Sequence, residues 1–336
     1  MPAARRPARW RSLLLGLRLL PRVLAQAARA YPRGDRERWP RQWRFVASAL
    51  RHPEAHRAML QFLDAPAWQP LARAHPKLAQ KIHKPYPCRG PGVAQRVAIV
   101  RRHYALAGAA FGPALLAAVA DRQDLAFCDV ALPAGQGTLP VRLGKQTRFE
   151  REGELTLSLM DPFGSLLYSA CFTLVDEAPG DEDAPGQGPV LLVGSLNGTA
   201  PRDVLRHITK LSHGLRPASL MVFLLQQAAA VAGARALRAV GRETHAYWGH
   251  PRHQEIRFDY DAFWAEEGGA PRPDGLFDLP LAPRRRDAAE LPSQKRAQYL
   301  RRYAWLDEVA ADVARRWSRP VGQGVGKGES EGEGAA

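Results

Sequence analysis

The spacing of apolar residues changes along the chain. It is helical over 39–63, with a break near Pro53, and again over 93–106 and 114–120. From there the apolar and β-forming residues fall into short runs, at 124–132, 139–143, 154–160 and 166–175. Asp161, Pro162 and Gly164 separate the last two runs and are typical of a hairpin turn. The pattern predicts a helical first part followed by antiparallel strands.

Two connecting segments are predicted to lack regular structure. The segment 78–87 places Tyr86 between two prolines, which favours an extended connection. The segment 148–153 carries charges of both signs, so we expect a solvated loop. His103, near the end of the helix over 93–106, is interpreted as a structural group rather than a site residue.

The stretch 189–217 organises the second half of the chain. Residues 189–193 form a short apolar run that predicts a buried strand, and 194–198 is predicted to be a turn framed by two glycines. A helix should follow from Pro201, with Thr199 as its N-cap and Gly214 at its end, and Pro217 should begin a second helix. Free backbone N–H groups in such a turn can hold an anion or a carbonyl oxygen. The alternative is a tight connection that binds nothing.

A second short strand is predicted over 236–241. With the strand at 189–193 and the helices between, it makes a β-α-β unit whose two strands are parallel. The helical spacing of the last apolar residues predicts a long C-terminal helix within 289–317. The fold class predicted is therefore α+β, with a mixed, mainly antiparallel sheet containing one parallel crossover, a helical N-terminal region and a long C-terminal helix.

Polar and aromatic residues gather after the second parallel strand. His245, Tyr247, Trp248, His250 and His253 all lie within 242–260. Ligands in open α/β sheets favour the carboxyl ends of parallel strands, so this segment and the turn 194–198 are predicted to form two walls of one site. The histidine spacing matches no helical metal motif and no cysteine lies nearby, so no metal is expected.

Charge is concentrated at the N-terminus. The net charge is +15, and residues 1–52 hold thirteen of the arginines. Trp10, Leu13, Leu14, Leu17, Leu20 and Leu24 share one face of a helical wheel, with arginines around the rest. This face would either lie on an anionic membrane surface or pack on the domain, and the segment would otherwise be a loose arm. Arg18 interrupts the apolar run, so we predict neither an exported signal peptide nor a transmembrane helix.

The sequence suggests one folded unit with two tails. We predict a basic arm over 1–38, a single domain over 39–319 with a helical part (39–121) and a mixed part (122–319), and a disordered Gly/Glu-rich tail over 320–336. The acidic Pro/Gly loop 178–188 is expected to lie outside the core. Cys88, Cys128 and Cys171 have no C-x-x-C spacing, which favours a reducing cytoplasmic compartment, with a peripheral position at the inner membrane as the alternative.

Several separate motifs together resemble one family. They are HPKLAQKIHKPYP, RRHYALA, EGELTLSL, LLVGSLNG, ITKLSHGLRP, VGRETHAYW, FDYDAFW and SQKRAQYLRRYAWLD. In this order they resemble the VirK/YbjX family of bacterial proteins, whose domain has no assigned activity. The chain departs from the expected pattern at Asn197, where a Gln is expected. The resemblance implies a role at the Gram-negative envelope, in virulence, surface-protein localisation and resistance to antimicrobial peptides.

The predicted order of elements is also similar to that of GNAT-type acyltransferases. In those enzymes a turn and a helix N-terminus bind the pyrophosphate of an acyl-carrier thioester. Acyl-CoA or another acyl-carrier thioester is therefore the cofactor this similarity implies. The chain lacks the repeated glycines of that loop and has an extra helix after Pro217.

Three functions remain open at this point. The first is acyl or aminoacyl transfer to an envelope component, with His245 as general base and Asp259 or Asp261 orienting it or the acceptor amine. Other residues predicted to bind substrate or cofactor are Gly194, Ser195, Asn197, Gly198, Lys210, His213, Arg216, Tyr247, Trp248, Tyr260 and Trp264. The second is a non-catalytic peripheral membrane or chaperone-like factor that binds anionic lipid through residues 1–30. The third, nonspecific nucleic-acid binding, rests on charge alone, and no specific nucleic acid is expected.

Overall fold

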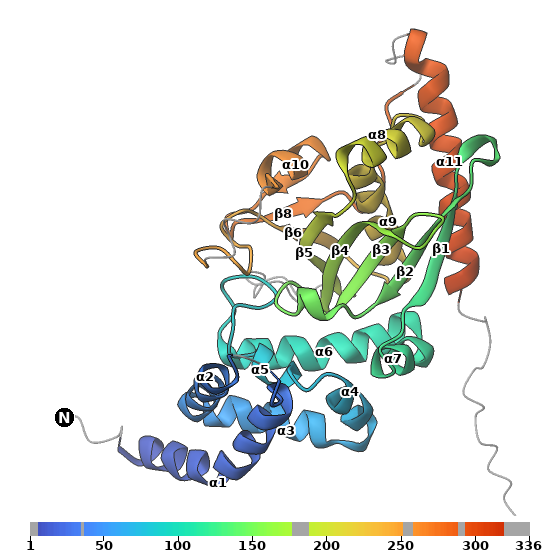
Figure 1. The fold of residues 1–336 in the computed structure, drawn as a ribbon. Coiled ribbons are helices and arrows are strands. Elements are labelled where there is room, and N and C mark those ends of the chain that lie inside the picture. The colour runs from blue at the N-terminus through green and yellow to red at the C-terminus, as the bar shows by residue number, and fades with distance from the viewer. Residues whose placement is uncertain (1–5, 35–36, 177–187, 251–257, 288–292, 319–336) are drawn as a thin grey trace, which may run out of the picture.

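The computed structural model describes residues 6–34, 37–176, 188–250, 258–287 and 293–318. A group of helices is followed by a sheet with further helices (Figure 1). The first helices are α1 (Arg6–Ala30), α2 (Arg38–Arg51), α3 (Pro53–Asp64), α4 (Gln69–Ala74), α5 (Leu78–Lys81), α6 (Val93–Phe111) and α7 (Pro113–Ala120), with a 3-10 turn η1 (Pro66–Trp68). In Figure 1, α6 lies between the sheet and the helices α1 to α4.

Within the described residues the strands form one eight-stranded sheet, in the order β1-β2-β3-β4-β5-β6-β8-β7. The strands are β1 (Leu125–Ala131), β2 (Thr138–Gly144), β3 (Leu155–Met160), β4 (Leu166–Val175), β5 (Val190–Gly198), β6 (Ala236–Val240), β7 (Ala270–Pro271) and β8 (Leu276–Leu279). The 3-10 turns η2 (Pro133–Gly135) and η3 (Thr147–Phe149) lie in loops. Neighbouring strands are antiparallel except β5 and β6, which are parallel. The mixed, mainly antiparallel α+β architecture is thus confirmed.

The remaining helices cover the sheet. Between β5 and β6 the chain forms α8 (Arg202–Leu211) and α9 (Pro217–Val231), then α10 (Tyr260–Glu266) and α11 (Ser293–Trp317) follow β6 and β8. α9 is mostly buried and packs on β3, β4, β5 and β6, while α6 packs on β4. One hydrophobic core includes residues from Leu19 of α1 to Val313 of α11.

α11 protects the free edge of β1. The indole N–H groups of Trp305 and Trp317 donate to the carbonyl oxygens of Ala131 (2.6 Å) and Phe127 (2.9 Å). Between them, the backbone N–H of Asp129 donates to Asp312 at 3.2 Å. Because these three β1 residues alternate along the strand, their backbone groups point to the edge that β2 does not use. A helix thus supplies the partners that another strand would offer.

Several sequence predictions need correction. Residues 78–81 form the short helix α5 rather than an extended connection. Thr199 does not cap α8: Pro201 is the N-cap residue, and the Thr199 hydroxyl donates to Leu166 at 2.6 Å. The short strands β7 and β8 were not predicted, because Pro271 and a four-residue run give little periodic signal. Pro217 at the start of α9 and the hairpin turn between β3 and β4 are confirmed.

Some predictions fall outside the described residues. The tail 320–336 and His253 belong to this group, as does the acidic loop except for Gly188. Among the described helices, none has both the length and the apolar character needed to cross a bilayer.

Candidate functional site

The segment 194–198 is strand, not turn. β5 continues to Gly198, and the register with β4 shifts between Phe172–Val193 and Cys171–Ser195, which leaves Gly194 as a bulge. A side chain does not fit at Gly194, because a Cβ there would overlap the carbonyl oxygen of Glu152. The bulge therefore allows the backbone at Glu152 to pack directly on β5. The prediction of a turn was wrong because a glycine in a strand can mark a bulge as well as a turn.

Backbone N–H groups in this segment and directly after it have partners. The Leu196 N–H donates to the hydroxyl of Tyr260 at 3.2 Å. The Thr199 and Ala200 N–H groups donate to the carbonyl oxygen of Leu167, at 3.1 and 3.3 Å. An anion bound by these three amides would have to displace those contacts. The segment is therefore not a ready anion cradle.

β5 and β6 diverge at this point. Their parallel pairing ends at Val193 and Ala239, whereas β5 runs on beside β4. Tyr260, at the start of α10, fills part of the divergence and is buried. The indole of Trp264, one turn later, is also buried and donates to the carbonyl oxygen of Val240 at 2.9 Å. α10 therefore holds the ends of the two strands apart.

His245 lies in the loop after β6, buried against Tyr260. Its ring stacks on the Tyr260 ring with 5.3 Å between centroids. Nδ1 accepts a hydrogen bond from the Tyr247 backbone N–H at 3.2 Å, so the neutral ring carries its proton on Nε2. Nε2 lies 3.2 Å from Oε1 of Glu152, although the geometry is not that of a hydrogen bond. The distance and the burial of both groups make this a close imidazole–carboxylate pair.

Glu152 is the site residue that the sequence did not reveal. It lies in the segment predicted to be solvated, yet it is buried. The only signal in the sequence is that Glu152 precedes a glycine, Gly153. The structure explains that glycine, because a Cβ there would come within 2.6 Å of the Cys171 sulfur. A glycine in such tight contact brings its neighbours against the sheet.

The predicted aspartates lie at the start of α10 instead. Asp259 caps α10 by accepting from the Ala262 N–H at 3.2 Å, and Asp261 accepts from the Arg242 N–H at 2.8 Å. Both contacts stabilise the start of α10 and the loop that carries His245. The carboxylate beside the imidazole is that of Glu152.

Three predicted binding residues lie near other helices. Lys210 is exposed at the end of α8. The carbonyl oxygen of His213 accepts hydrogen bonds from Gln298 and Arg302 of α11, at 3.1 and 2.7 Å. Arg216 forms an ion pair with Glu266 of α10 at 2.9 Å.

The two predicted aromatic residues lie in the same loop as His245. Tyr247 and Trp248 are half-buried, with the guanidinium groups of Arg151 and Arg242 over their rings.

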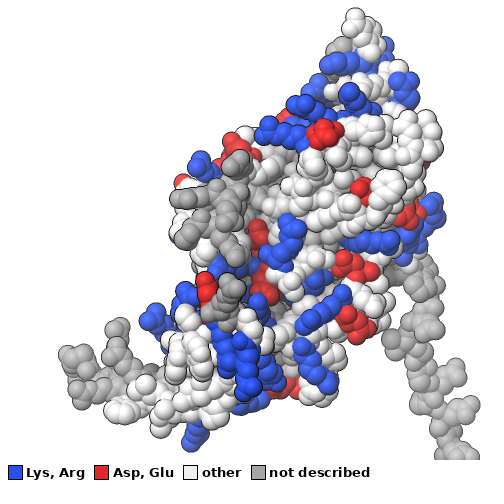
Figure 2. All heavy atoms as spheres, in the orientation of Figure 1, with Lys and Arg blue, Asp and Glu red and all other residues white. Residues whose placement is uncertain are grey.

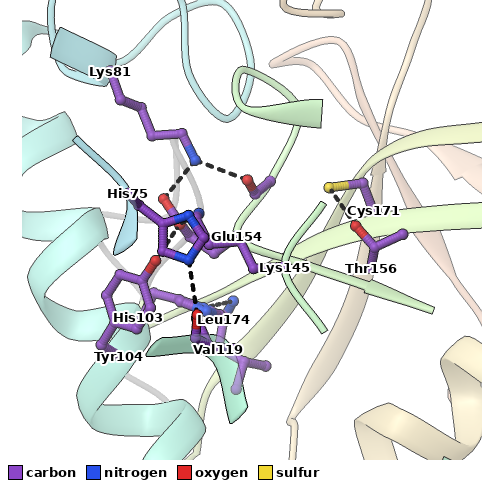
Figure 3. A network of polar contacts seen from close by, with 11 residues as sticks. His75, Lys81, His103, Tyr104, Val119, Lys145, Glu154, Thr156, Cys171 and Leu174 are labelled. Atoms are coloured by element: carbon purple, nitrogen blue, oxygen red, sulfur yellow. Dashed lines mark hydrogen bonds and ion pairs between the residues drawn. The ribbon is translucent and has the colours of Figure 1, made fainter. Parts of the chain in front are cut away.

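A second buried polar cluster lies next to this pair (Figure 3). The Glu154 carboxylate, fully buried, contacts the Lys81 ammonium at 2.6 Å, the Lys145 ammonium, and the Tyr104 hydroxyl at 2.7 Å. Burial alone would raise the pKa of Glu154, but the two ammonium groups hold that pKa well below its ordinary value. Burial also lowers the pKa of Lys81 to about 8.

This cluster joins the two parts of the fold. Lys81 and Tyr104 come from α5 and α6, whereas Lys145 follows β2 and Glu154 precedes β3. His103, also in α6, accepts from the Leu174 N–H of β4 at 3.0 Å, and burial lowers its pKa to about 3. We interpret the cluster as structural, because its charged groups satisfy one another. Among the described residues, no group of three or more His, Cys, Asp or Glu side chains could hold a metal ion.

Comparisons with known proteins give a family but no activity. A family model described as "Protein of unknown function (DUF535)" matches residues 34–315. The chain is 27% identical over 251 residues to the uncharacterized protein YbjX of Escherichia coli K12, covering 73% of each chain. It is 32% identical over 126 residues to an uncharacterized protein of Haemophilus influenzae, covering 37% of this chain and 42% of that protein. The resemblance to the VirK/YbjX family is confirmed.

Proposed function

The chain belongs to the DUF535 family of proteins of unknown function, and we propose that it is an acyl- or aminoacyl-transferase with a GNAT-like core that modifies an envelope component. The observation that carries this proposal is the divergence of β5 and β6 beside a buried imidazole–carboxylate pair. The order of elements, with an antiparallel meander, a parallel β5–β6 pair and helices between them, is similar to that of GNAT-type enzymes. Fold similarity alone would be weak support for function, so the proposal depends on the site.

The pair supplies a base. Transfer of an acyl group to an amine requires a group that accepts the proton of the attacking nitrogen. The Tyr247 N–H engages Nδ1 of His245, and Nε2 faces Glu152. Glu152 therefore accepts the proton, and the His245 ring lies 3.2 Å from its carboxylate. This assignment differs from the sequence prediction, in which His245 was the base and an aspartate oriented it.

The donor would bind where β5 leads into α8. α8 has no side-chain N-cap, so its first-turn N–H groups are free of that competition, and they favour the phosphates of an acyl-carrier thioester. Asp203 in the same turn opposes an anion, so the α8 N-terminus holds phosphates more weakly than a helix start without an acidic residue.

Thermal-shift measurements with coenzyme A, acetyl-CoA, a long-chain acyl-CoA and an aminoacyl-tRNA test the proposal. We expect one donor class to raise the melting temperature, and transfer from that donor to be lost in Glu152→Gln while donor binding persists. Glu37→Gln, which changes a glutamate in an exposed pair with Arg41, is the control. If no donor class produces a shift or a crosslink, the transferase proposal is wrong.

A second candidate function has its own observation. α1 and α2 expose apolar side chains away from the core, with Trp10 67%, Leu17 66% and Trp43 63% exposed. Leu13, Leu14 and Leu24 of α1 and Trp39 and Leu50 of α2 are exposed as well. α1 packs through its other side, with Leu19, Val23 and Ala27 buried. Most of the face that was expected either to bind membrane or to pack on the domain is therefore exposed, while Leu20 of that face packs on the core.

This face suits a membrane surface. Its apolar residues recur at helical spacing, and Lys and Arg side chains gather over the region of α2 in Figure 2. Aromatic and leucine side chains enter the lipid interface while arginines contact anionic headgroups. A peripheral membrane factor without catalysis would need this face and no donor site.

Vesicle flotation separates the two functions. We expect binding to vesicles containing phosphatidylglycerol but weak binding to phosphatidylcholine alone. The triple variant Trp10→Gln, Leu13→Gln, Leu17→Gln should lose it, while Phe163→Ser, which removes an apolar side chain 94% exposed at the β3–β4 turn, should not. If the wild type floats with the vesicles and no donor changes its melting temperature, the non-catalytic factor is favoured. If the triple variant floats as well as the wild type, this face has no membrane role.

A further inference from the structure

Six small side chains form a polar patch on one face of β3, β4 and β5. In one row Thr156 pairs with Cys171, which pairs with Ser195, and in the next Ser158 pairs with Ser169, which pairs with Asn197. Directly paired residues on neighbouring strands point to the same side of a sheet. Leu155, Leu157 and Leu159 alternate with the β3 members and belong to the core on the other face. We call these six residues the polar patch.

The patch contains buried polar atoms without partners. Ser169 and Ser195 are fully buried, and neither hydroxyl oxygen has a hydrogen-bond partner. The Nδ2 atom of Asn197 is also buried and unpartnered. Leaving a buried polar group unsatisfied destabilises the fold, so three on one patch are a concentrated exception to the rule that buried polar groups are paired. Polar residues kept at this cost suit a ligand that supplies the missing partners.

The Glu152–His245 pair lies beside the patch. The backbone at Glu152 rests on Gly194, next to Ser195, and the neighbouring Gly153 lies against the Cys171 sulfur. Burial and then the Glu152 carboxylate raise the pKa of the Cys171 thiol to about 12. Cys171 therefore stays protonated and is no nucleophile. At the other end Asn197 is half-buried and Gly198 exposed, so the patch reaches the surface there.

We propose that the polar patch and Glu152 bind an amino alcohol, a small molecule or headgroup with a primary ammonium beside hydroxyl groups. The ammonium pairs with the Glu152 carboxylate, which is buried beside the patch. The ligand's hydroxyl oxygens accept from Asn197 Nδ2 and exchange hydrogen bonds with the Ser169 and Ser195 hydroxyls. This deepens the proposed function, on which its role as acceptor rests. The ammonium gives one proton to the Glu152 carboxylate, and the resulting amine nitrogen forms a bond to the acyl carbon of the donor. The bond between that carbon and the carrier breaks, and the carrier leaves as a thiol or hydroxyl that takes the second proton of the nitrogen.

Binding of the amine alone tests the inference. Ethanolamine and glucosamine are titrated against the full chain without donor, followed by calorimetry or NMR, with ethylene glycol and glucose as probes that lack the amine. We expect the amines to bind and the neutral probes to bind more weakly. Glu152→Gln should weaken amine binding by about tenfold or more, because it removes a charge-assisted hydrogen bond, and Ser195→Ala should weaken it by about three- to tenfold, because it removes a neutral one.

Ser212→Ala is the matched control, because Ser212 is a fully buried serine with an unpartnered hydroxyl outside the patch. It should bind amines as the wild type does. Removing an unsatisfied hydroxyl also removes its desolvation cost, so Ser195→Ala should unfold at the same or a higher denaturant concentration. Weaker binding with unchanged or greater stability is a result that misfolding cannot produce.

The outcomes separate this inference from the proposed function. If a donor shifts the melting temperature but the amines do not bind, or bind equally to Ser195→Ala and the wild type, the amino-alcohol site is wrong and the transferase stands. If the amines bind as expected but no donor does, the site stands and the transferase is wrong.

Discussion

Glu154 keeps a charged carboxylate in the interior because three donors converge on it. Lys81 and Lys145 would lack a counter-charge if the carboxylate were neutralised. Breaking one partner of a buried ion pair costs about 3–5 kcal/mol. We therefore expect Glu154→Gln to lower the free energy of unfolding by about that amount, measured by urea denaturation at neutral pH. Glu37→Gln, at an exposed ion pair, should change little, and an equal loss in both variants would contradict the role of burial.

The same carboxylate gives a pH dependence. The pKa of Glu154 in the folded protein lies well below its ordinary value of 4.5. Its stabilising contribution is therefore complete above pH 4.5 and declines as the pH falls from there toward the folded-state pKa. The difference in unfolding free energy between wild type and Glu154→Gln should narrow below pH 4.5. Denaturation curves at stepped acidic pH measure it, and a constant difference would show that Glu154 does not titrate in this way.

Neither buried glutamate was predictable from the sequence. From Glu154 onward polar residues alternate with leucines, which normally indicates a strand with one solvated face. The burial comes from distant partners: His245 contacts Glu152 from the loop after β6, and Lys81 contacts Glu154 from α5. His245 itself was predictable, because its position after a parallel strand is a local feature.

Gly194 determines how the segment at Glu152 approaches the sheet. A methyl group at this position would overlap the Glu152 carbonyl, so Gly194→Ala must displace either β5 or the Glu152 backbone. Overpacking of this kind costs about 1–3 kcal/mol or more. We expect that loss in denaturant unfolding, together with weaker amine binding. Gly34→Ala is the control, since a Cβ at Gly34 meets no atom within 4 Å.

At the scale of elements, the helices and strands predicted correctly are those whose apolar spacing extends over many residues. The antiparallel strands, α9 and α11 follow from apolar spacing with Gly or Pro at their ends. The extent of β5 was missed because a bulge and a turn share the same glycine signal, and only the pairing with β4 separates them. The pairing of β8 with β6 is set by the whole sheet rather than by its four residues.

The edge contact of α11 leads to a prediction of its own. Trp305→Phe with Trp317→Phe keeps aromatic packing but removes both indole donors to β1. Each lost hydrogen bond should cost about 0.5–1.5 kcal/mol, and the uncovered edge should promote self-association. Denaturation and size-exclusion chromatography measure both effects. Trp68→Phe is the control, because among the described contacts the Trp68 indole N–H has no hydrogen-bond partner. If Trp68→Phe aggregates and the double variant does not, the two indoles of α11 do not protect the β1 edge.

Across the whole molecule, α1 lies on the side of α6 away from the sheet, whereas the loop that carries His245 follows strand β6 of that sheet (Figure 1). Two properties that depend on separate surfaces should respond independently to substitution. We expect the triple variant of Trp10, Leu13 and Leu17 to bind amines normally, and Glu152→Gln to float with anionic vesicles normally. Coupled losses would show that the membrane face and the site act as one unit.

Because α11 covers the edge of β1, that edge stays uncovered during synthesis until α11 has been made. Asp129 and Arg316 form an ion pair across 187 positions of sequence. At a synthesis rate of about 5–20 residues per second, the ribosome needs roughly ten to forty seconds to complete that interval. During it the nascent β1 has no partner for its outer backbone groups. The growing chain therefore passes through a stage in which chaperones, rather than its own helix, must keep that strand from pairing with other polypeptides.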